Sequence, residues 1–85
     1  MNKNFSDIAW EEYQYWVQND RKILRRINEL LQDIERNGHR GIGKPEPLKY
    51  DLEGFWSRRI TDEHRLIYNI EGNTINVAKC RKHYK

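Results

Sequence analysis

Apolar side chains recur at helical spacing in the first quarter of the chain. Ala9, Tyr13 and Trp16 fall at positions i, i+4 and i+7, so they share one face of a helix. Ser6 directly precedes this pattern and belongs to a residue type that caps helix N-termini. The pattern therefore predicts an amphipathic helix over residues 7–18.

A second apolar stripe follows, made of aliphatic side chains at mostly three- and four-residue spacing: Ile23, Ile27, Leu30, Leu31 and Ile34. It predicts a helix over residues 21–36, with Asp20 as its N-cap and Asn37-Gly38 as its stop. Charged side chains occupy much of the remaining surface of this helix: Arg25, Arg26, Glu29, Asp33 and Arg36. Neither helix can bury its stripe alone, so a sheet must cover the hairpin that the two helices form.

The second half of the chain is rich in β-branched and aromatic residues. Three runs predict strands over residues 55–61, 64–70 and 74–81, with turns at Asp62-Glu63 and Gly72-Asn73. Two weaker segments predict short strands over residues 49–52, before a turn at Glu53-Gly54, and over residues 1–5. We therefore expect a single α+β domain over residues 1–85, in which two N-terminal helices pack on an antiparallel sheet.

Alternation along the strands assigns side chains to the two faces of this sheet. The apolar residues expected to meet the helices are Trp56, Ile60, Leu66, Tyr68 and Ile70. Arg59 and Arg65 alternate out of step with them and should lie on the open face. In the last strand Ile75 and Val77 fall in step with Arg81, so a bulge or bend between them is needed to separate apolar from basic side chains.

Composition limits the size of the core and points to a basic surface. With 85 residues, 36% hydrophobic and 34% charged, the domain must depend on a few large side chains such as Trp10, Trp16 and Trp56, or on a partner. The net charge is only +3, but residues 79–85 carry four Lys or Arg and no acid. A basic face that binds nucleic acid or an acidic peptide is one interpretation, and a merely solvated basic surface is the other.

The single cysteine argues against a disulfide and a zinc site. Cys80 has no second cysteine to pair with, no Cys/His spacing typical of zinc is present, and a small buried core residue is the favoured interpretation over a thiol nucleophile. His39 and His64 are interpreted as surface or packing residues. The sequence also has no signal-peptide pattern and no membrane-length apolar run, so we expect a soluble, cytoplasmic protein.

Residues 44–65 concentrate the groups that could perform chemistry. Pro45 and Pro47 preset the backbone on either side of Glu46 and hold this acid in a stiff, exposed connection. Four cations follow on what are predicted as consecutive short strands: Lys49, Arg58, Arg59 and Arg65. One carboxylate facing several arginines suggests chemistry on a phosphate.

Together with a histidine near the C-terminus, these groups suit metal-free cleavage of RNA. Glu46 would take the proton of a ribose 2′-OH, His83 would protonate the leaving 5′-oxygen, and Arg59 and Arg65 would neutralise the phosphorane. DNA lacks this nucleophile, so selectivity for RNA would be intrinsic. No paired carboxylates suited to a two-metal site are evident, and we expect no cofactor.

The run GKPEPLKYDLEGFWSRRITDEHRLIY with the terminal CRKHYK resembles the YoeB toxins of the RelE superfamily, and the resemblance extends back through IxxxINELLQD and the aromatic residues of the first helix. It implies a RelE-like fold with two N-terminal helices on a twisted antiparallel sheet. It also implies ribosome-dependent cleavage of mRNA in the decoding (A) site. The polar first strand and the extra Lys85 depart from the family pattern.

The resemblance assigns a role to six positions of this sequence. Glu46 matches the general base, His83 the general acid, and Arg65 the residue that stabilises the transition-state phosphate. The positions that would bind the RNA are Lys49, Arg59 and Tyr84, the last by stacking on or orienting the substrate. The implied partners are the bacterial ribosome with its mRNA, a YefM-like antitoxin whose inhibitory segment is disordered when free, and a second copy of the chain.

Two functions of other classes remain as alternatives. A ParE-like relative would share the fold but inhibit a topoisomerase by protein contact, and a simple basic RNA-binding module would need neither an acid nor a histidine. The combination of Glu46, Arg65 and His83 argues against both.

Overall fold

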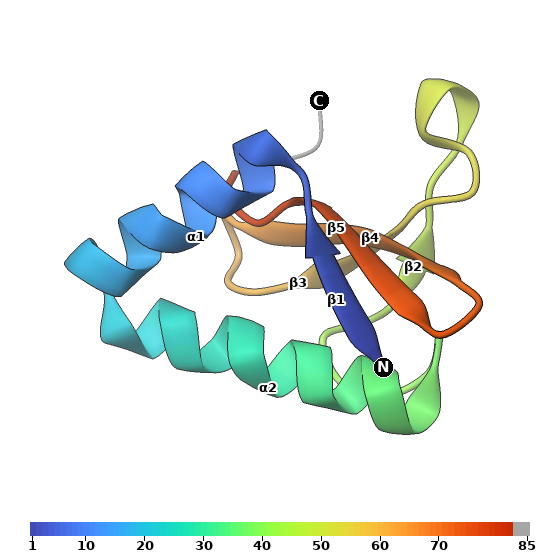
Figure 1. Ribbon diagram of the computed structural model, residues 1–85, viewed down its shortest axis with the longest axis horizontal. Coiled ribbons are helices and arrows are strands. Elements are labelled where there is room, and N and C mark those ends of the chain that lie inside the picture. The colour runs from blue at the N-terminus through green and yellow to red at the C-terminus, as the bar shows by residue number, and fades with distance from the viewer. Residues whose placement is uncertain (83–85) are drawn as a thin grey trace.

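The computed structural model describes residues 1–82 and places two helices and five strands in them. In chain order these are β1 (Asn2–Phe5), α1 (Asp7–Asn19), α2 (Arg21–Asn37), β2 (Glu46–Pro47), β3 (Trp56–Arg59), β4 (Arg65–Glu71) and β5 (Thr74–Lys79). Figure 1 shows α1 and α2 as the two arms of a V beside the sheet. No helix within residues 1–82 is long and apolar enough to cross a membrane.

Both predicted helices are confirmed, with the predicted caps. The Ser6 hydroxyl accepts a hydrogen bond from the Ala9 N–H at 3.0 Å, and the Asp20 carboxylate accepts from the N–H groups of Lys22 and Ile23. Gly38 ends α2 with a φ of +64° and donates its N–H to the Ile34 carbonyl. Caps of these kinds satisfy backbone groups that a helix end leaves without a partner.

The sheet is mixed, with the strand order β1-β5-β4-β3-β2. Four strands are antiparallel to their neighbours, as expected, but β1 pairs in parallel with β5, from Asn2 opposite Thr74 to Phe5 opposite Val77. The expectation of a purely antiparallel sheet is therefore corrected at this edge. A parallel partner is possible because the two helices carry the chain away from β1 before the antiparallel strands begin.

The strand predicted over residues 49–52 is wrong. The chain pairs with β3 earlier, at Glu46 and Pro47, and Tyr50–Leu52 instead forms a short 3₁₀ helix that begins with Tyr50 at a φ of +58°. β2 is one of the two edge strands of the sheet, where a proline is tolerated because its missing N–H need not join a ladder.

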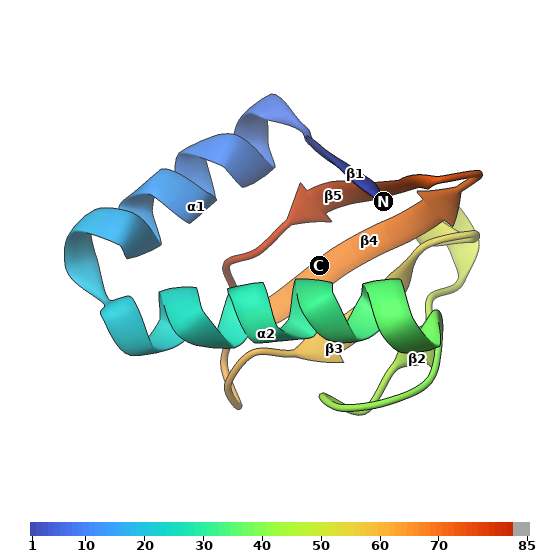
Figure 2. The ribbon, with the colours of Figure 1, turned by 60° about the horizontal axis from the view of Figure 1, so that its bottom comes forward.

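The core lies between the two helices and one face of the sheet, as Figure 2 shows with α2 running across the strands. The helices contribute the buried residues Ala9, Trp16, Ile27, Leu30, Leu31 and Ile34, and the second half contributes Ile60, Leu66, Tyr68, Ile75, Val77 and Cys80. Of the three tryptophans, only Trp16 is buried, whereas Trp10 is 52% exposed. Trp10 therefore contributes less to the core than its size suggested.

The bulge that the sequence required lies in β5. Tyr68 pairs with Val77 whereas Ile67 pairs with Lys79, so Ala78 is the extra residue. This shift lets Val77 and Cys80 both point into the core, at 1% and 0% exposure.

Candidate active site

The strand register brings Glu46, Arg59 and Arg65 onto one face of the sheet. In an antiparallel ladder, directly paired residues point to the same face. One row of such pairs runs across four strands through Glu46, Ser57, Ile67 and Lys79, and the next row contains Arg59 opposite Arg65. The rows are about 7 Å apart, because two strand residues span that length. Both rows lie on the face opposite the core residues Leu66 and Tyr68, and for Arg59 and Arg65 this is the face that alternation predicted.

Glu46 borders a small hollow at the edge of the sheet. The hollow has a volume of about 290 Å³ and is lined by Glu46, Pro47, Leu48, Lys49 and Tyr50. Glu46 and Lys49 are both exposed, and Tyr50 is 91% exposed. The structure therefore brings the predicted acid and the predicted lysine to the same hollow, which is accessible to a ligand from solvent.

Arg65 is held at the start of β4 by the turn that precedes it. Its Nη1 donates to the carbonyls of Thr61 at 2.7 Å and Asp62 at 2.9 Å, and also to its own neighbour His64 at 3.2 Å. These contacts fix the guanidinium at the end of the β3–β4 hairpin, beside the exposed Arg59. A fixed guanidinium with a second arginine beside it is suited to binding the oxygens of a phosphate.

Arg58 does not belong to this cationic face, contrary to its place in the predicted run of cations. It points to the helix side and is completely buried. Its guanidinium forms an ion pair with Asp33 and donates to three loop carbonyls, those of Gly38, Arg40 and Ile42, at 2.6–3.0 Å. A buried charge needs such partners, so Arg58 is a structural residue.

Asp33 is one of the charged residues predicted on the surface of α2 outside the apolar stripe. It is instead 16% exposed, accepts from the Ile42 N–H at 3.1 Å, and pairs with Arg58. Hydrogen bonding from Arg58 is the largest cause and lowers the pKa of the Asp33 carboxyl below its usual value, although burial acts in the opposite direction; Ile42 and Asn37 lower it further. The carboxylate is therefore charged in the folded protein at neutral pH.

The loop held by Arg58 and Asp33 leads directly to Glu46. Gly41 has a φ of +120°, and a Cβ there would collide with the Asp33 carboxylate. Gly43 has a φ of +80°, a Cβ there would lie 2.8 Å from Leu30, and its carbonyl accepts from the Arg59 N–H at 2.7 Å. The glycines therefore let the loop approach α2 and β3 closely enough to fix where β2 begins.

The remaining predicted site residues, His83 and Tyr84, lie outside the described residues. The chain that leads to them is buried at Cys80, and burial raises the pKa of this thiol to about 12. A thiol with such a pKa stays protonated at neutral pH, which agrees with a core residue and not with a nucleophile.

The two other histidines are packing residues, as interpreted from the sequence, but both have partners that the sequence did not reveal. His39 stacks on Trp56 with ring centroids 4.1 Å apart, and burial together with the nearby Arg58 lowers its pKa. His64 packs edge-on to Trp16 at 4.7 Å and accepts a hydrogen bond from the Lys82 N–H. The partners lie 17 to 48 residues away along the chain, so no local pattern could identify them.

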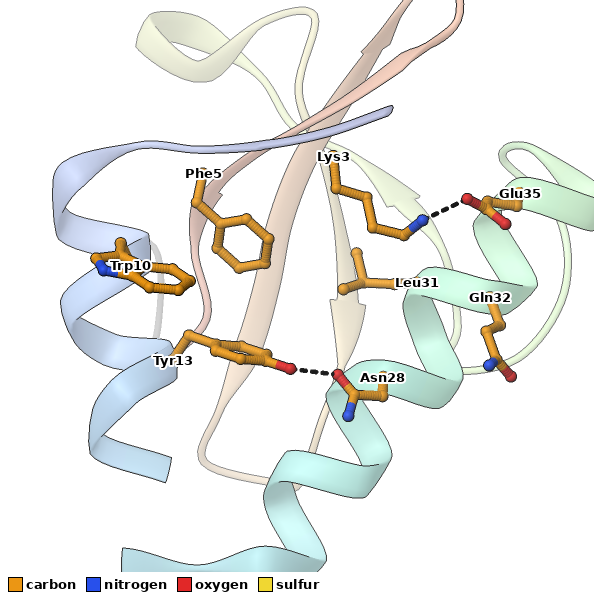
Figure 3. A pocket seen from close by; sticks show the side chains of 8 residues that line it. All are labelled: Lys3, Phe5, Trp10, Tyr13, Asn28, Leu31, Gln32 and Glu35. Carbon is orange, nitrogen blue, oxygen red and sulfur yellow. Dashed lines mark hydrogen bonds and ion pairs between the residues drawn. The ribbon is translucent and has the colours of Figure 1, made fainter. Parts of the chain in front are cut away.

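A second, more apolar hollow lies on the helix side of the molecule, away from Glu46. Figure 3 shows Phe5, Trp10 and Tyr13 on one wall and Leu31 and Gln32 of α2 on the other, around a volume of about 470 Å³. It is bordered by the Lys3–Glu35 ion pair and by a hydrogen bond between Tyr13 and Asn28. This hollow does not combine an acid with arginines, so it is not the candidate active site.

Among residues 1–82, no group of three or more His, Cys, Asp or Glu side chains is arranged to hold a metal ion.

Comparison with known proteins places these features in a family. A model of the YoeB-like toxins of bacterial type II toxin-antitoxin systems matches residues 5–84. The toxin YoeB of Escherichia coli (strain K12) is 50% identical over 80 residues, which cover 94% of this chain and 95% of that protein. Two Staphylococcus aureus structures, a YoeB-YefM complex and a YoeB dimer, superpose with TM-scores of 0.94 and 0.93 at 52% and 53% identity, each covering 99% of this chain and 98% of the other. The chain thus belongs to the YoeB family of type II toxins.

Proposed function

We propose that this chain is an endoribonuclease that cleaves mRNA on the ribosome, in the A site, and thereby inhibits translation. The observation that carries the proposal is the placement of Glu46, Arg59 and Arg65 on one open face of the sheet. Membership in a family of toxins supports it, since such a protein needs an activity that harms the cell.

The proposed reaction begins at the ribose 2′-OH. Glu46 accepts the proton of this hydroxyl, and the oxygen attacks the adjacent phosphorus to form a phosphorane. Arg65, assisted by Arg59, neutralises the negative charge that develops on the equatorial oxygens. The bond to the 5′-oxygen then breaks as His83 donates a proton to it. The products are a 2′,3′-cyclic phosphate and a 5′-hydroxyl, and exchange with water restores both catalytic groups.

The other groups of the face serve binding. Lys49 lies at the hollow beside Glu46 and supplies positive charge to the RNA backbone, and Tyr84 stacks on or orients a base. The proposed reaction uses no metal or cofactor, because protein groups supply the base, the acid and the charge.

The proposed partners follow from the family and from the open basic face. A YefM-like antitoxin covers the active face, as the YoeB-YefM complex of S. aureus suggests for this chain, and a second copy of the chain is a further partner. Because the substrate is mRNA on the ribosome, the proposed site of action is the cytoplasm.

The proposal is tested with purified toxin, intact ribosomes and a defined mRNA. Wild-type protein should cut the mRNA in the A site to fragments that end in a 2′,3′-cyclic or 3′-phosphate, and a 2′-deoxyribose at the cut position should prevent cleavage. Fragments with a 3′-hydroxyl and a 5′-phosphate would contradict attack by the 2′-OH. Cleavage of free mRNA at the same rate would contradict dependence on the ribosome.

A further inference from the structure

The chain segment that precedes His83 is fixed at two successive points. At Cys80, the carbonyl accepts a hydrogen bond from the indole N–H of Trp16 at 2.9 Å, and the N–H donates to Glu12 at 2.7 Å. At Lys82, the N–H donates to Nδ1 of His64 at 2.8 Å, and the carbonyl accepts from the N–H of Arg65 at 3.1 Å. His64, just before β4, and Arg65, the first residue of β4, therefore bind both backbone groups of Lys82.

Lys82 adopts a backbone conformation that a lysine rarely takes. Its φ is +61°, in the left-handed region, which is unfavourable for a residue with a Cβ. Such a conformation persists only where the surroundings determine it, and it often accompanies a functional site. Here the surroundings are His64 and Arg65, and the residue that follows in the sequence is His83.

His64 is itself held in one orientation. Its side chain is nearly buried, its ring packs edge-on to Trp16, and its backbone N–H donates to the Thr61 hydroxyl at 3.0 Å. Because the Lys82 N–H can only donate, Nδ1 of His64 must be the acceptor, and the ring carries its proton on Nε2. The Nε2 atom lies 3.7 Å from the exposed carboxylate of Glu63.

We propose that His64 is a positioning residue for catalysis: its Nδ1 fixes Lys82 and so sets the direction in which the chain enters His83. The inference rests on the proposed function, in which His83 is the general acid. It also gives a role to the contact between this turn and Lys82, because His64 and Arg65 together bind both backbone groups of the residue that precedes His83. An acid misplaced by about 1 Å can cost a large part of the rate.

Two variants of similar shape distinguish the loss of the hydrogen-bond acceptor from the loss of ring packing. In His64→Asn, Oδ1 occupies the place of Nδ1 and can still accept from Lys82, whereas His64→Leu has nearly the same shape and no acceptor. Both lose the ring that packs on Trp16, so their melting temperatures should fall by similar amounts. The single-turnover rate on ribosomes should fall about 10-fold or more in His64→Leu and stay near the wild-type rate in His64→Asn. The ribosome concentration that gives half the maximal rate should not change, because binding is not affected.

A backbone variant tests the same hydrogen bond from the other side and leaves His64 intact. Cys80 allows a synthetic peptide of residues 80–85 to be ligated to residues 1–79, and an ester in place of the Arg81–Lys82 amide replaces the Lys82 N–H by an oxygen that cannot donate. The rate should fall as in His64→Leu, relative to the all-amide ligated protein. Combined with His64→Leu, the ester should cause little further loss, since both changes remove one interaction. This variant decides the question even if His64→Leu does not fold.

The outcomes distinguish the inference from the proposed function. If the wild type cuts ribosome-bound mRNA but His64→Leu, or the ester variant, cuts as fast as its control, His64 does not position the acid. Equal losses in His64→Leu and His64→Asn would likewise overturn the inference, because packing alone would explain them. If the wild type does not cut mRNA at all, the proposed function is wrong and the inference fails with it.

Discussion

Two adjacent arginines on β3 should respond to the same substitution in opposite ways. Arg58 is completely buried on the helix side, where its guanidinium binds Asp33 and three loop carbonyls. Arg59 is exposed on the open face beside Arg65. Methionine preserves much of the length of either side chain and removes the charge, so Arg58→Met and Arg59→Met form a matched pair.

The loss of stability expected for Arg58→Met depends on the groups that lose their partner. Removing one partner of a buried ion pair costs about 3–5 kcal/mol, because the other charge stays without compensation. Asp33 is 16% exposed and can recover some hydration, which favours the lower end of this range. The carbonyls of Gly38, Arg40 and Ile42 also lose a donor, which raises the cost again. We therefore expect a loss of about 3–5 kcal/mol.

This loss is a large part of the total stability of such a domain. At roughly 0.05–0.15 kcal/mol per residue, 85 residues give an unfolding free energy of about 4–13 kcal/mol. With a urea dependence of about 1 kcal/mol per M for a small protein, the urea midpoint of Arg58→Met should fall by about 3 M or more. Arg59→Met should stay within about 0.5 kcal/mol of the wild type, as is usual for exposed positions, but cut ribosome-bound mRNA more slowly.

The assay is urea unfolding followed by tryptophan fluorescence, with cleavage measured on the same preparations. The double variant Asp33→Leu/Arg58→Met removes the uncompensated carboxylate as well, so it should be more stable than Arg58→Met alone. Unchanged stability in Arg58→Met would refute the reasoning. So would a double variant that is less stable than the single one, because the carboxylate would then not be the source of the loss.

Three further predictions concern the site, a histidine and the partner. Glu46→Ala and Arg65→Ala should each lower single-turnover cleavage about 100-fold or more with little change in melting temperature, and a variant that melts early but still cuts would show a structural role. Burial lowers the pKa of His39, so the unfolded chain takes up a proton more readily than the folded chain, and the unfolding free energy should fall as the pH drops from 7 to 5.5. Urea titrations at both pH values should show a smaller fall of the unfolding free energy in His39→Phe. The melting temperature should rise with the concentration of a YefM-like antitoxin, and the rate of association measured by stopped flow should fall as salt increases. An association rate that does not depend on salt would mean that the antitoxin does not cover the basic face.

The sequence predicted the parts of the fold that depend on local patterns. The stripes of α1 and α2, their caps at Ser6 and Asp20, and the need for a bulge in β5 all follow from spacing along the chain, and all are confirmed. The parallel pairing of β1 did not follow, because its partner β5 lies about 70 residues away and Asn2–Phe5 carries little apolar pattern. The placement of Tyr50–Leu52 in a 3₁₀ helix depends on where the edge strand pairs, which the local sequence does not state.

In the candidate site, too, local patterns predicted some positions and not others, and Arg58 shows why. Alternation along β3 was enough to place Arg59 on the open face, and the same rule puts Arg58 on the helix side. The charge of Arg58 favoured an exposed position instead, since a buried arginine is rare unless it is paired. Only the fold supplies the pair, because Asp33 lies 25 residues earlier on α2 and the carbonyls belong to an irregular loop. In a run such as Arg58-Arg59, strand alternation is therefore the stronger guide, and an arginine that it sends inward predicts a buried acid on the element that packs there.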